Sequence, residues 1–372
     1  MSKTTPHTIL MTSDTVGGVW NYSLILSKAL QEYEVEVHLA TMGKALRPDQ
    51  WKEANKIDNL IIHESEYALE WMENPWSDIE EAGNWLLNLE QNTEPDLIHL
   101  NNYAFGNLLW KSPLLTVGHS CVLSWWKAVH REKAPPEWRR YASQVKKGLQ
   151  QADTVIGITQ NMLKELKSFY GPFSKSKVIY NAQEPGRFSP KEKNYEIFSM
   201  GRVWDKAKNI RALQQIASDL NWPVFIAGNS RGELDTTKTE NLHFLGELST
   251  QEVAERLSKS AIYVMPARYE PFGLSVLEAA LSGCALVLGD IPTLRELWQD
   301  AALFANPDNP EELHEQINRL IHQPELREEM AGKAMDCAKK YSLQKMGEAY
   351  WKMYCELCEA FIPEEKNQIL TA

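Results

Sequence analysis

The sequence has no apolar run close to the roughly 20 residues that a membrane-spanning helix needs. Its first residues, MSKTTPHTILMTSD, contain one lysine but no long apolar segment, so we expect no signal peptide. The five cysteines are scattered and odd in number, which favours a reducing cytoplasm. Cys355 and Cys358 form a CxxC without a second pair, and we interpret them as ordinary helix residues rather than a zinc site.

The absence of two motifs and the negative net charge argue against three classes of ligand. No GxGxxG pattern is present, and no acidic residue ends the second predicted strand at 38–42, which argues against a dinucleotide site. There is no DxD in the chain, so the sequence does not indicate a metal held by paired carboxylates. The net charge of −11 argues against a general nucleic-acid binder.

Short apolar runs typical of strands alternate with amphipathic helical stretches along the chain. A length of 372 residues is too great for one ordinary core, and a polar, proline-containing stretch at 183–194 has the composition of a linker. We therefore predict two doubly wound α/β domains with mostly parallel sheets, which bind ligands at the carboxyl ends of their strands and leave a cleft between them. The predicted strands are 8–13, 36–42, 60–65, 97–103, 114–120 and 154–159 before the linker, and 196–202, 223–229, 242–248, 261–267 and 284–290 after it.

The most informative stretch is ARYEPFGLSVLEAALSG, residues 267–283. Pro271 and Gly273 predict a turn after a strand, and SVLEAALSG predicts a short buried helix that ends at Gly283. The backbone N–H groups at such a helix start form an anion site, here those of Phe272, Gly273, Leu274 and Ser275. We expect Phe272 to be exposed and the carboxylates of Glu270 and Glu278 to accept hydrogen bonds from sugar hydroxyls. The alternative is that Glu278 is an ordinary helix residue and Glu270 a surface charge.

Two other motifs each follow the first predicted strand of a domain. In SMGRVWDKAKN, Arg202 and Lys208 place two cations just past a strand, where they suit a diphosphate; the alternative is a solvated basic turn. In SDTVGGVWNY, Gly17 and Gly18 allow a ligand to approach the backbone at a helix start; the alternative is an ordinary βα turn.

Together these motifs resemble the retaining glycosyltransferases of family 4, which have the GT-B fold. The resemblance covers nearly the whole chain. It depends on Glu270 and Glu278 at E-x7-E spacing, on the GR and KN pairs, on the diglycine, and on VGHS at the fifth strand. Family members commonly have one residue fewer between GR and the lysine, so Lys206 is the alternative to Lys208.

The resemblance implies a role for each of these residues. Glu278 would hold the donor's ribose, Glu270 would lie near the hydroxyls of the transferred sugar, and the backbone of 272–274 would hold sugar and phosphate. Arg202 and Lys208 would neutralise the leaving diphosphate, which the backbone at Gly18 would face from the other domain. His119 matches a histidine beside the transferred sugar, although a lone histidine after a strand is more often structural.

The resemblance also implies an architecture and a reaction. It implies a GT-B fold with an N-terminal acceptor-side domain (1–185), a C-terminal nucleotide-sugar domain (195–342), and a last helix (343–362) that crosses back to the first domain. The reaction would be metal-independent hexose transfer from a nucleotide-diphosphate sugar, with a UDP-sugar favoured and GDP-mannose as the second donor. Because no side chain is clearly placed as a covalent nucleophile, front-face attack by the acceptor hydroxyl is preferred.

The acceptor is less well defined. Residues 110–187 hold 13 lysines and arginines against five acidic residues, a net charge of +8, whereas residues 1–109 carry −11. This asymmetry fits an anionic acceptor or a peripheral contact with the inner membrane surface, although we favour a solvated helix face. Trp125 and Trp126 are a candidate stacking platform for an acceptor saccharide, glycolipid or small metabolite. A sugar-nucleotide epimerase and a non-catalytic sugar-nucleotide binder remain alternatives.

Overall fold

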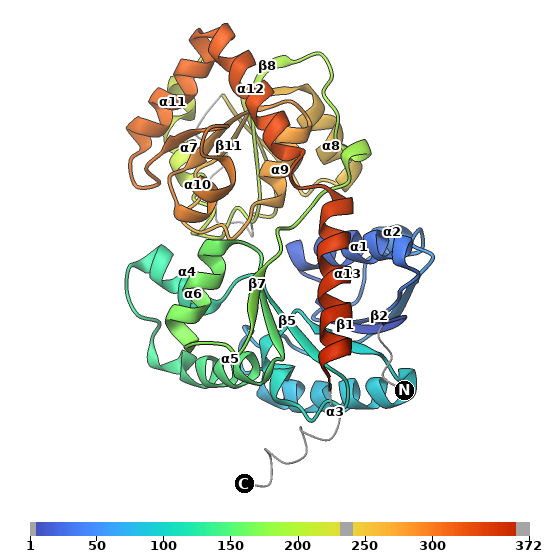
Figure 1. Cartoon of the computed structure of the whole chain (residues 1–372). Helices are drawn as coiled ribbons and strands as arrows, with labels where there is room; N and C mark the ends of the chain where they lie inside the picture. Colours follow the sequence, from blue (N-terminus) through green and yellow to red (C-terminus); the bar gives the residue numbers. More distant parts are fainter. Residues whose placement is uncertain (1–4, 231–240, 362–372) are drawn as a thin grey trace. The chain divides into compact units, whose positions relative to one another are not determined.

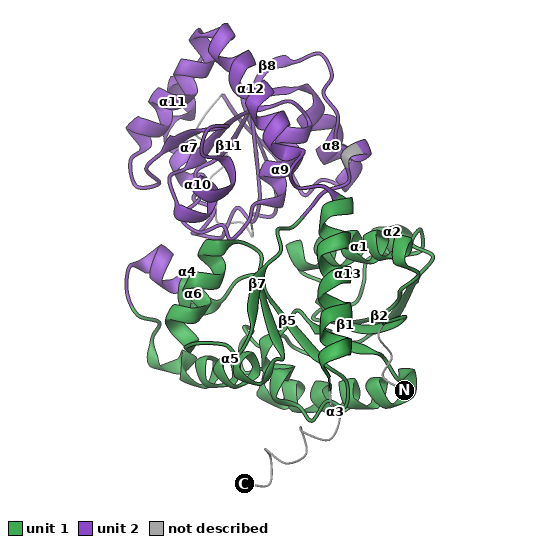
Figure 2. Cartoon of the chain, in the orientation of Figure 1, with its two compact units in different colours: residues 1–124, 133–181, 343–372 green, residues 125–132, 182–342 purple. Residues whose placement is uncertain are grey.

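The computed structural model describes residues 5–230 and 241–361, which divide into two compact units (Figures 1 and 2). Unit 1 comprises residues 1–124, 133–181 and 343–372, and unit 2 comprises residues 125–132 and 182–342. The chain therefore leaves unit 1 near residue 182 and returns to it at residue 343.

Unit 1 is built on a parallel sheet of seven strands in the order β3-β2-β1-β4-β5-β6-β7. Nearly every residue of β1, β2, β4, β5 and β6 is buried, as expected for a parallel sheet whose two faces are covered. The strands are β1 (Thr8–Asp14), β2 (Glu36–Met42), β3 (Leu60–Glu64), β4 (Leu97–Leu100), β5 (Leu114–Gly118), β6 (Thr154–Gly157) and β7 (Ser176–Val178).

The helices of unit 1 include the last helix of the chain. They are α1 (Gly18–Leu30), α2 (Pro48–Ala54), α3 (Trp76–Thr93), α5 (Arg139–Gln151), α6 (Gln160–Tyr170) and α13 (Leu343–Ala360). Helix α13 packs against α1, and it buries Met346, Tyr350, Met353, Tyr354 and Leu357. This confirms the expected return of the C-terminal helix to the first domain. Cys355 and Cys358 lie on α13 without a disulfide, as expected for ordinary helix residues.

Unit 2 contains a second parallel sheet, with six strands in the order β10-β9-β8-β11-β12-β13. The strands are β8 (Asn194–Met200), β9 (Val224–Ala227), β10 (Leu242–Gly246), β11 (Ser260–Met265), β12 (Ala285–Gly289) and β13 (Leu303–Ala305). The helices are α7 (Ile210–Ile216), α8 (Thr250–Lys259), α9 (Leu274–Leu281), α10 (Pro292–Trp298), α11 (Pro310–His322) and α12 (Pro324–Ala338). Helix α4 (Val122–His130) begins in unit 1, and its residues from Trp125 onward are grouped with unit 2.

Two Rossmann-like units with parallel sheets confirm the predicted fold class. The predicted strands lie within a few residues of the observed ones, but the prediction omitted β7 and β13, each only three residues long. The predicted short helix after the EPFG turn is α9, and Gly283 follows it with a φ of 75°.

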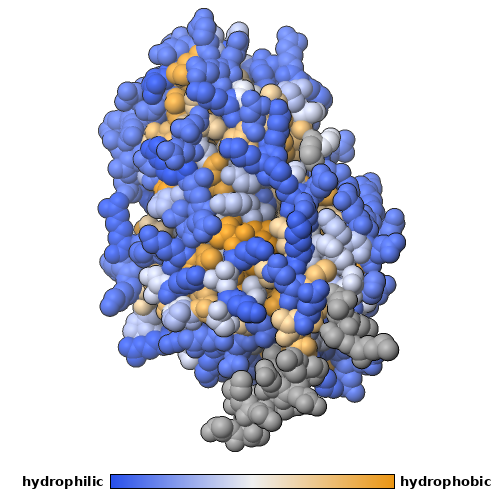
Figure 3. All heavy atoms as spheres, viewed as in Figure 1, coloured by the Kyte–Doolittle hydropathy of each residue, from blue (hydrophilic) through white to orange (hydrophobic). Residues whose placement is uncertain are grey.

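Hydrophilic side chains cover most of the face shown in Figure 3. Within the described residues, no helix is both long enough and apolar enough to cross a bilayer.

Candidate functional site

In both units several of the predicted site residues follow strands at the point where the strand order reverses, whereas His119 follows β5 and Trp125 and Trp126 lie on α4. In unit 1 this point lies between the neighbouring strands β1 and β4, and in unit 2 between β8 and β11. Helices that follow such neighbouring strands run to opposite faces of the sheet, so a crevice opens at the carboxyl ends of the strands. The diglycine follows β1, Arg202 follows β8, and the turn that carries Glu270 follows β11.

Arg202 is held by a carboxylate that the sequence interpretation did not assign. Its Nη2 donates to Oδ2 of Asp205 at 2.8 Å. The other oxygen, Oδ1, accepts from the backbone N–H of Ala207 at 2.9 Å and from Nε1 of Trp125 at 3.2 Å. The Asp205 side chain is 3% exposed and that of Arg202 is 46% exposed, so a buried anchor holds a cation that reaches solvent.

Lys208, rather than Lys206, lies at the β11 turn. Its ammonium group pairs with Oε2 of Glu270, and both side chains are largely buried. Lys206 is exposed. The amide of the next residue, Asn209, donates to the carbonyl oxygens of Pro266 at 2.9 Å and Pro307 at 2.8 Å. The KN pair therefore connects the β8 loop to the end of β11.

The turn before α9 requires glycine for its conformation and for space. Gly273 has a φ of 86°, which L side chains rarely adopt. A Cβ there would lie 3.1 Å from Val276 Cγ2 and 3.3 Å from Glu270 Cγ. Phe272 is 2% exposed and packs edge-to-face on Tyr341, so the expectation that it is exposed was wrong. The first backbone N–H groups of α9 have no acceptor within the helix, which leaves them available to an anion.

Glu278 is a buried carboxylate inside α9. It is 6% exposed, and its Oε1 accepts from Nε2 of Gln183 at 2.9 Å. Burial raises the pKa of Glu278 to about 7, while the Gln183 hydrogen bond and the charge of Arg187 oppose the rise. Burying a carboxylate is costly without hydrogen-bond partners, so hydroxyl groups of a ligand would stabilise its ionised form.

The diglycine in unit 1 begins α1. Gly17 is the N-cap residue, with a φ of 109° and open space where a Cβ would stand, and Gly18 is the first helical residue. The conformation rather than crowding therefore requires glycine at position 17. The open space leaves room for a ligand at the start of the helix.

His119, directly after β5, has a defined tautomer. Asn101, directly after β4, donates through Nδ2 to the carbonyl oxygen of Thr12 at 2.6 Å, which fixes the amide orientation. Its Oδ1 lies 2.8 Å from Nε2 of His119 and can only accept, so Nε2 carries the proton and Nδ1 the lone pair. Burial lowers the pKa of His119 to about 3, which keeps the ring neutral.

Trp125 and Trp126 belong to an aromatic cluster with His130. Trp126 stacks on His130 with ring centroids 4.5 Å apart, and Trp125 meets Trp126 edge-to-face at 5.8 Å. The indole N–H of Trp125 is the Asp205 donor described above. Both indole rings therefore already contact other side chains of the protein, and the predicted contact with an acceptor stays a prediction.

The sequence interpretation missed Asp205, Gln183 and Asn101. Asp205 lies in the quoted motif three residues after Arg202, a spacing that could have identified it as a partner of the arginine. Gln183 lay in the predicted linker, and Asn101 lay in a predicted strand. Only the fold shows that they contact Glu278 and His119.

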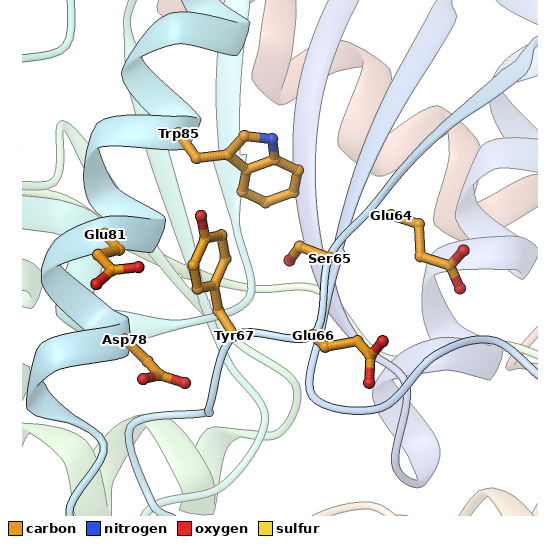
Figure 4. Close-up of a pocket in the computed structure, with 7 residues that line it drawn as sticks. All are labelled: Glu64, Ser65, Glu66, Tyr67, Asp78, Glu81 and Trp85. Atoms are coloured by element: carbon orange, nitrogen blue, oxygen red, sulfur yellow. The ribbon is translucent and has the colours of Figure 1, made fainter.

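A separate acidic groove of about 440 Å³ lies in unit 1 beyond the end of β3 (Figure 4). Its lining includes Glu64, Glu66, Asp78 and Glu81. Asp78 accepts from the backbone N–H of Ala68, and Glu64 from that of Leu46. Four carboxylates repel a diphosphate, so a diphosphate is expected near Arg202 and Lys208 in unit 2 rather than in this groove.

Two family models match the chain and together extend from residue 16 to residue 336. The model for glycosyltransferase family 4 matches residues 16–187, and the model for glycosyl transferases group 1 matches residues 182–336. The chain belongs to this family of glycosyltransferases.

Curated relatives include several sugar transferases. Over 170 residues the chain is 26% identical to O-antigen chain mannosyltransferase RfbU of Salmonella typhimurium, covering 43% of this chain and 48% of that protein. Over 127 residues it is 32% identical to an N,N'-diacetylbacillosaminyl-diphospho-undecaprenol alpha-1,3-N-acetylgalactosaminyltransferase of Campylobacter jejuni, covering 34% and 33%. These matches span about half or less of the relatives' length.

Solved structures are similar over almost the whole chain. Sucrose-phosphate synthase from Thermosynechococcus elongatus has a TM-score of 0.78 at 16% identity, covering 95% of this chain and all of that one. Anabaena HepE in complex with UDP-glucose has a TM-score of 0.74 at 15% identity, covering 94% of this chain and all of that one. At this identity the similarity establishes the fold alone.

Proposed function

We propose that this protein is a retaining, metal-independent glycosyltransferase that moves a hexose from a nucleotide-diphosphate sugar to a hydroxyl group of an acceptor. The observation that carries the proposal is the grouping in unit 2 of Arg202, Lys208, the start of α9 and the buried carboxylate of Glu278. The first three suit a diphosphate, and the last suits a ribose.

Each part of the donor has a matching group in this proposal. The diphosphate binds Arg202, Lys208 and the backbone N–H groups of residues 272–275, and the ribose hydroxyls donate to Glu278. Glu270 already lies beside Lys208, so a sugar on the diphosphate comes within reach of its carboxylate. In unit 1, Gly17 and Gly18 leave the start of α1 open to the approach of a phosphate group.

The proposed chemistry needs charge stabilisation at the leaving group. The bond between the anomeric carbon and the phosphate oxygen breaks, and its electron pair stays on the diphosphate. Arg202, Lys208 and the helix N–H groups stabilise that charge. The acceptor oxygen bonds to the same face of the sugar and gives its proton to the leaving phosphate oxygen, which retains the configuration. Within residues 5–230 and 241–361, no cluster of three or more histidine, cysteine or acidic side chains could hold a metal ion.

His119 contributes as a neutral hydrogen-bond acceptor in this scheme. Its Nε2–H is engaged by Asn101, so Nδ1 is left to accept a hydroxyl proton of the transferred sugar. Trp125 and Trp126 are our candidates for contacts with the acceptor, which we take to be a saccharide, a glycolipid or a small metabolite.

For the donor we favour a UDP-sugar, because the similar HepE structure contains UDP-glucose. GDP-mannose is the second candidate, because the relative RfbU is an O-antigen chain mannosyltransferase. A sugar-nucleotide epimerase or a non-catalytic binder would bind the same donors, so binding alone does not separate the three functions.

A thermal-shift screen with UDP-, GDP-, ADP- and TDP-sugars tests the donor site, because a ligand that binds only the native state raises its stability. The best donor is then incubated with the protein alone, where epimerisation would contradict transferase activity. The last arm measures nucleoside-diphosphate release with an acceptor in excess EDTA. We expect full activity there, and a loss that magnesium or manganese restores would contradict the metal-free chemistry.

A further inference from the structure

Unit 1 contains a buried cluster of aromatic side chains with polar groups that the proposed reaction does not use. Tyr22 comes from α1, His99 from β4, and Tyr350 and Tyr354 from α13, and each is at most 1% exposed. Burying polar groups is costly unless they are hydrogen-bonded, and leucine or phenylalanine would dock a helix without that cost. Three phenols and an imidazole therefore indicate more than apolar packing.

The hydrogen bonds of this cluster form one directed chain. Tyr22 donates to the hydroxyl of Tyr350 at 2.7 Å, so at 3.1 Å from Nε2 of His99 its oxygen must accept. His99 is then protonated on Nε2, and its Nδ1 accepts from the hydroxyl of Tyr354 at 2.7 Å. Burial lowers the pKa of His99 to about 3, so the ring is neutral, as this chain requires. The C-terminal helix therefore fixes the phenol of Tyr22.

Tyr22 in turn packs against His119. The two rings meet edge-to-face, with centroids 4.4 Å apart and an interplanar angle of 72°. The Asn101 hydrogen bond holds one nitrogen of His119, and by itself it allows the ring to swing about that contact. The Tyr22 ring blocks this movement, so the two restraints together fix where Nδ1 points.

We infer that Tyr350 of the C-terminal helix is a positioning residue for His119 and acts through Tyr22. The inference rests on the proposed function for its effect on turnover, but the position of the His119 ring can be measured without activity. Hydrogen-bonded side-chain networks fix one orientation where apolar packing tolerates several. The cluster thereby makes the docking of α13 a condition for an aligned His119.

The test uses the full chain with Tyr350→Phe, which removes one hydroxyl and keeps the ring. Tyr33→Phe is the matched control: Tyr33 stacks on Trp351 of α13 with centroids 5.0 Å apart, outside the chain of hydrogen bonds. In protein with ¹⁵N-labelled histidine, the His119 signals are assigned by their loss in His119→Gln. We expect Tyr350→Phe to shift the His119 ring signals and Tyr33→Phe to leave them in place.

The kinetic arm separates positioning from stability. With the donor found by the screen, Tyr350→Phe should lower kcat about three- to tenfold and leave the donor KM within about twofold, because a small displacement affects the transition state most. In a His119→Ala background the same substitution should have no further effect.

Two outcomes overturn the inference. One is a destabilised Tyr350→Phe protein whose His119 signals are unchanged, which would make the cluster purely structural. The other is a loss in turnover that simply adds to that of His119→Ala. If no donor binds in the screen, the proposed function fails, while the NMR comparison still decides whether Tyr350 positions His119.

Discussion

At the scale of single residues, both cations proposed to meet the diphosphate are already paired with carboxylates. Arg202 is held by Asp205 and Lys208 by Glu270. Asp205 keeps two other donors on Oδ1, so it stays anchored when Arg202 turns to a phosphate. A preorganised cation needs little rearrangement as charge develops, which favours the transition state over the bound substrate.

Arg202→Ala should therefore lower turnover about 100-fold, the usual cost of removing one preorganised donor. Arg202→Lys should restore only part of the rate, because a point charge does not reproduce the guanidinium fork. Release of nucleoside diphosphate in the presence of donor and acceptor measures both. The exposed neighbour Lys206→Ala is the control, and a comparable loss there would show that Lys206 is the residue that meets the diphosphate.

The buried carboxylate of Glu278, proposed to bind the ribose, should lower the stability of the unliganded protein. Its pKa rises from an ordinary 4.5 to about 7 on folding, so the folded state binds the extra proton, and stability falls as pH rises between these values. Glu278→Gln should then stabilise the unliganded protein more at pH 8 than at pH 5, by about 2 kcal/mol. Urea unfolding at the two pH values measures this difference. Glu315→Gln, exposed on α11, is the control, and equal gains at both pH values for Glu278→Gln would contradict a raised pKa.

At the scale of helices and strands, local patterns predicted the elements but not the contacts between distant ones. The apolar runs identified β1 and β11, and the EPFG turn identified the start of α9. Strands β7 and β13, with three residues each, were too short to predict. Phe272 follows a turn and was expected to be exposed, but Tyr341, 69 positions later, covers it.

The same limit applies to the candidate site. The proximity of Glu270 and Glu278 could be predicted from the sequence, because both lie on one turn and the helix that follows it. The contact between Gln183 and Glu278 spans 95 positions, and that between Tyr22 and Tyr350 spans 328. No periodicity encodes such pairs, so they follow only from the topology.

The docking of α13 on α1 depends on one close approach. A Cβ at Gly347 would lie 2.9 Å from Cβ of Ala29, whereas one at Gly332 on α12 would meet nothing within 4 Å. The same Gly→Ala change raises helix propensity at both sites. We expect Gly347→Ala to be less stable than Gly332→Ala by about 1–3 kcal/mol, the usual cost of overpacking. Hydrogen exchange of the α13 amides measures the effect, and equal protection in both variants would contradict close packing.

At the scale of the whole molecule, the proposed site residues are divided between the two units. The groups proposed to bind the nucleotide lie in unit 2, apart from Gly17 and Gly18, and His119 lies in unit 1. Glu278 is proposed to meet the ribose, which does not react, and His119 to meet the transferred sugar. Binding and turnover should therefore respond to different substitutions.

Glu278→Ala should weaken binding of the donor nucleotide about tenfold to a hundredfold, since losing a charged hydrogen bond costs roughly 1.5–3 kcal/mol. His119→Ala should lower kcat and leave nucleotide affinity nearly unchanged, because its partner is absent from the nucleoside diphosphate. Calorimetric titration with the nucleoside diphosphate and steady-state kinetics of the same two proteins separate the effects. A folded Glu278→Ala protein with unchanged affinity would remove the ribose role. A His119→Ala protein that loses nucleotide affinity but keeps its kcat would contradict the division between the units.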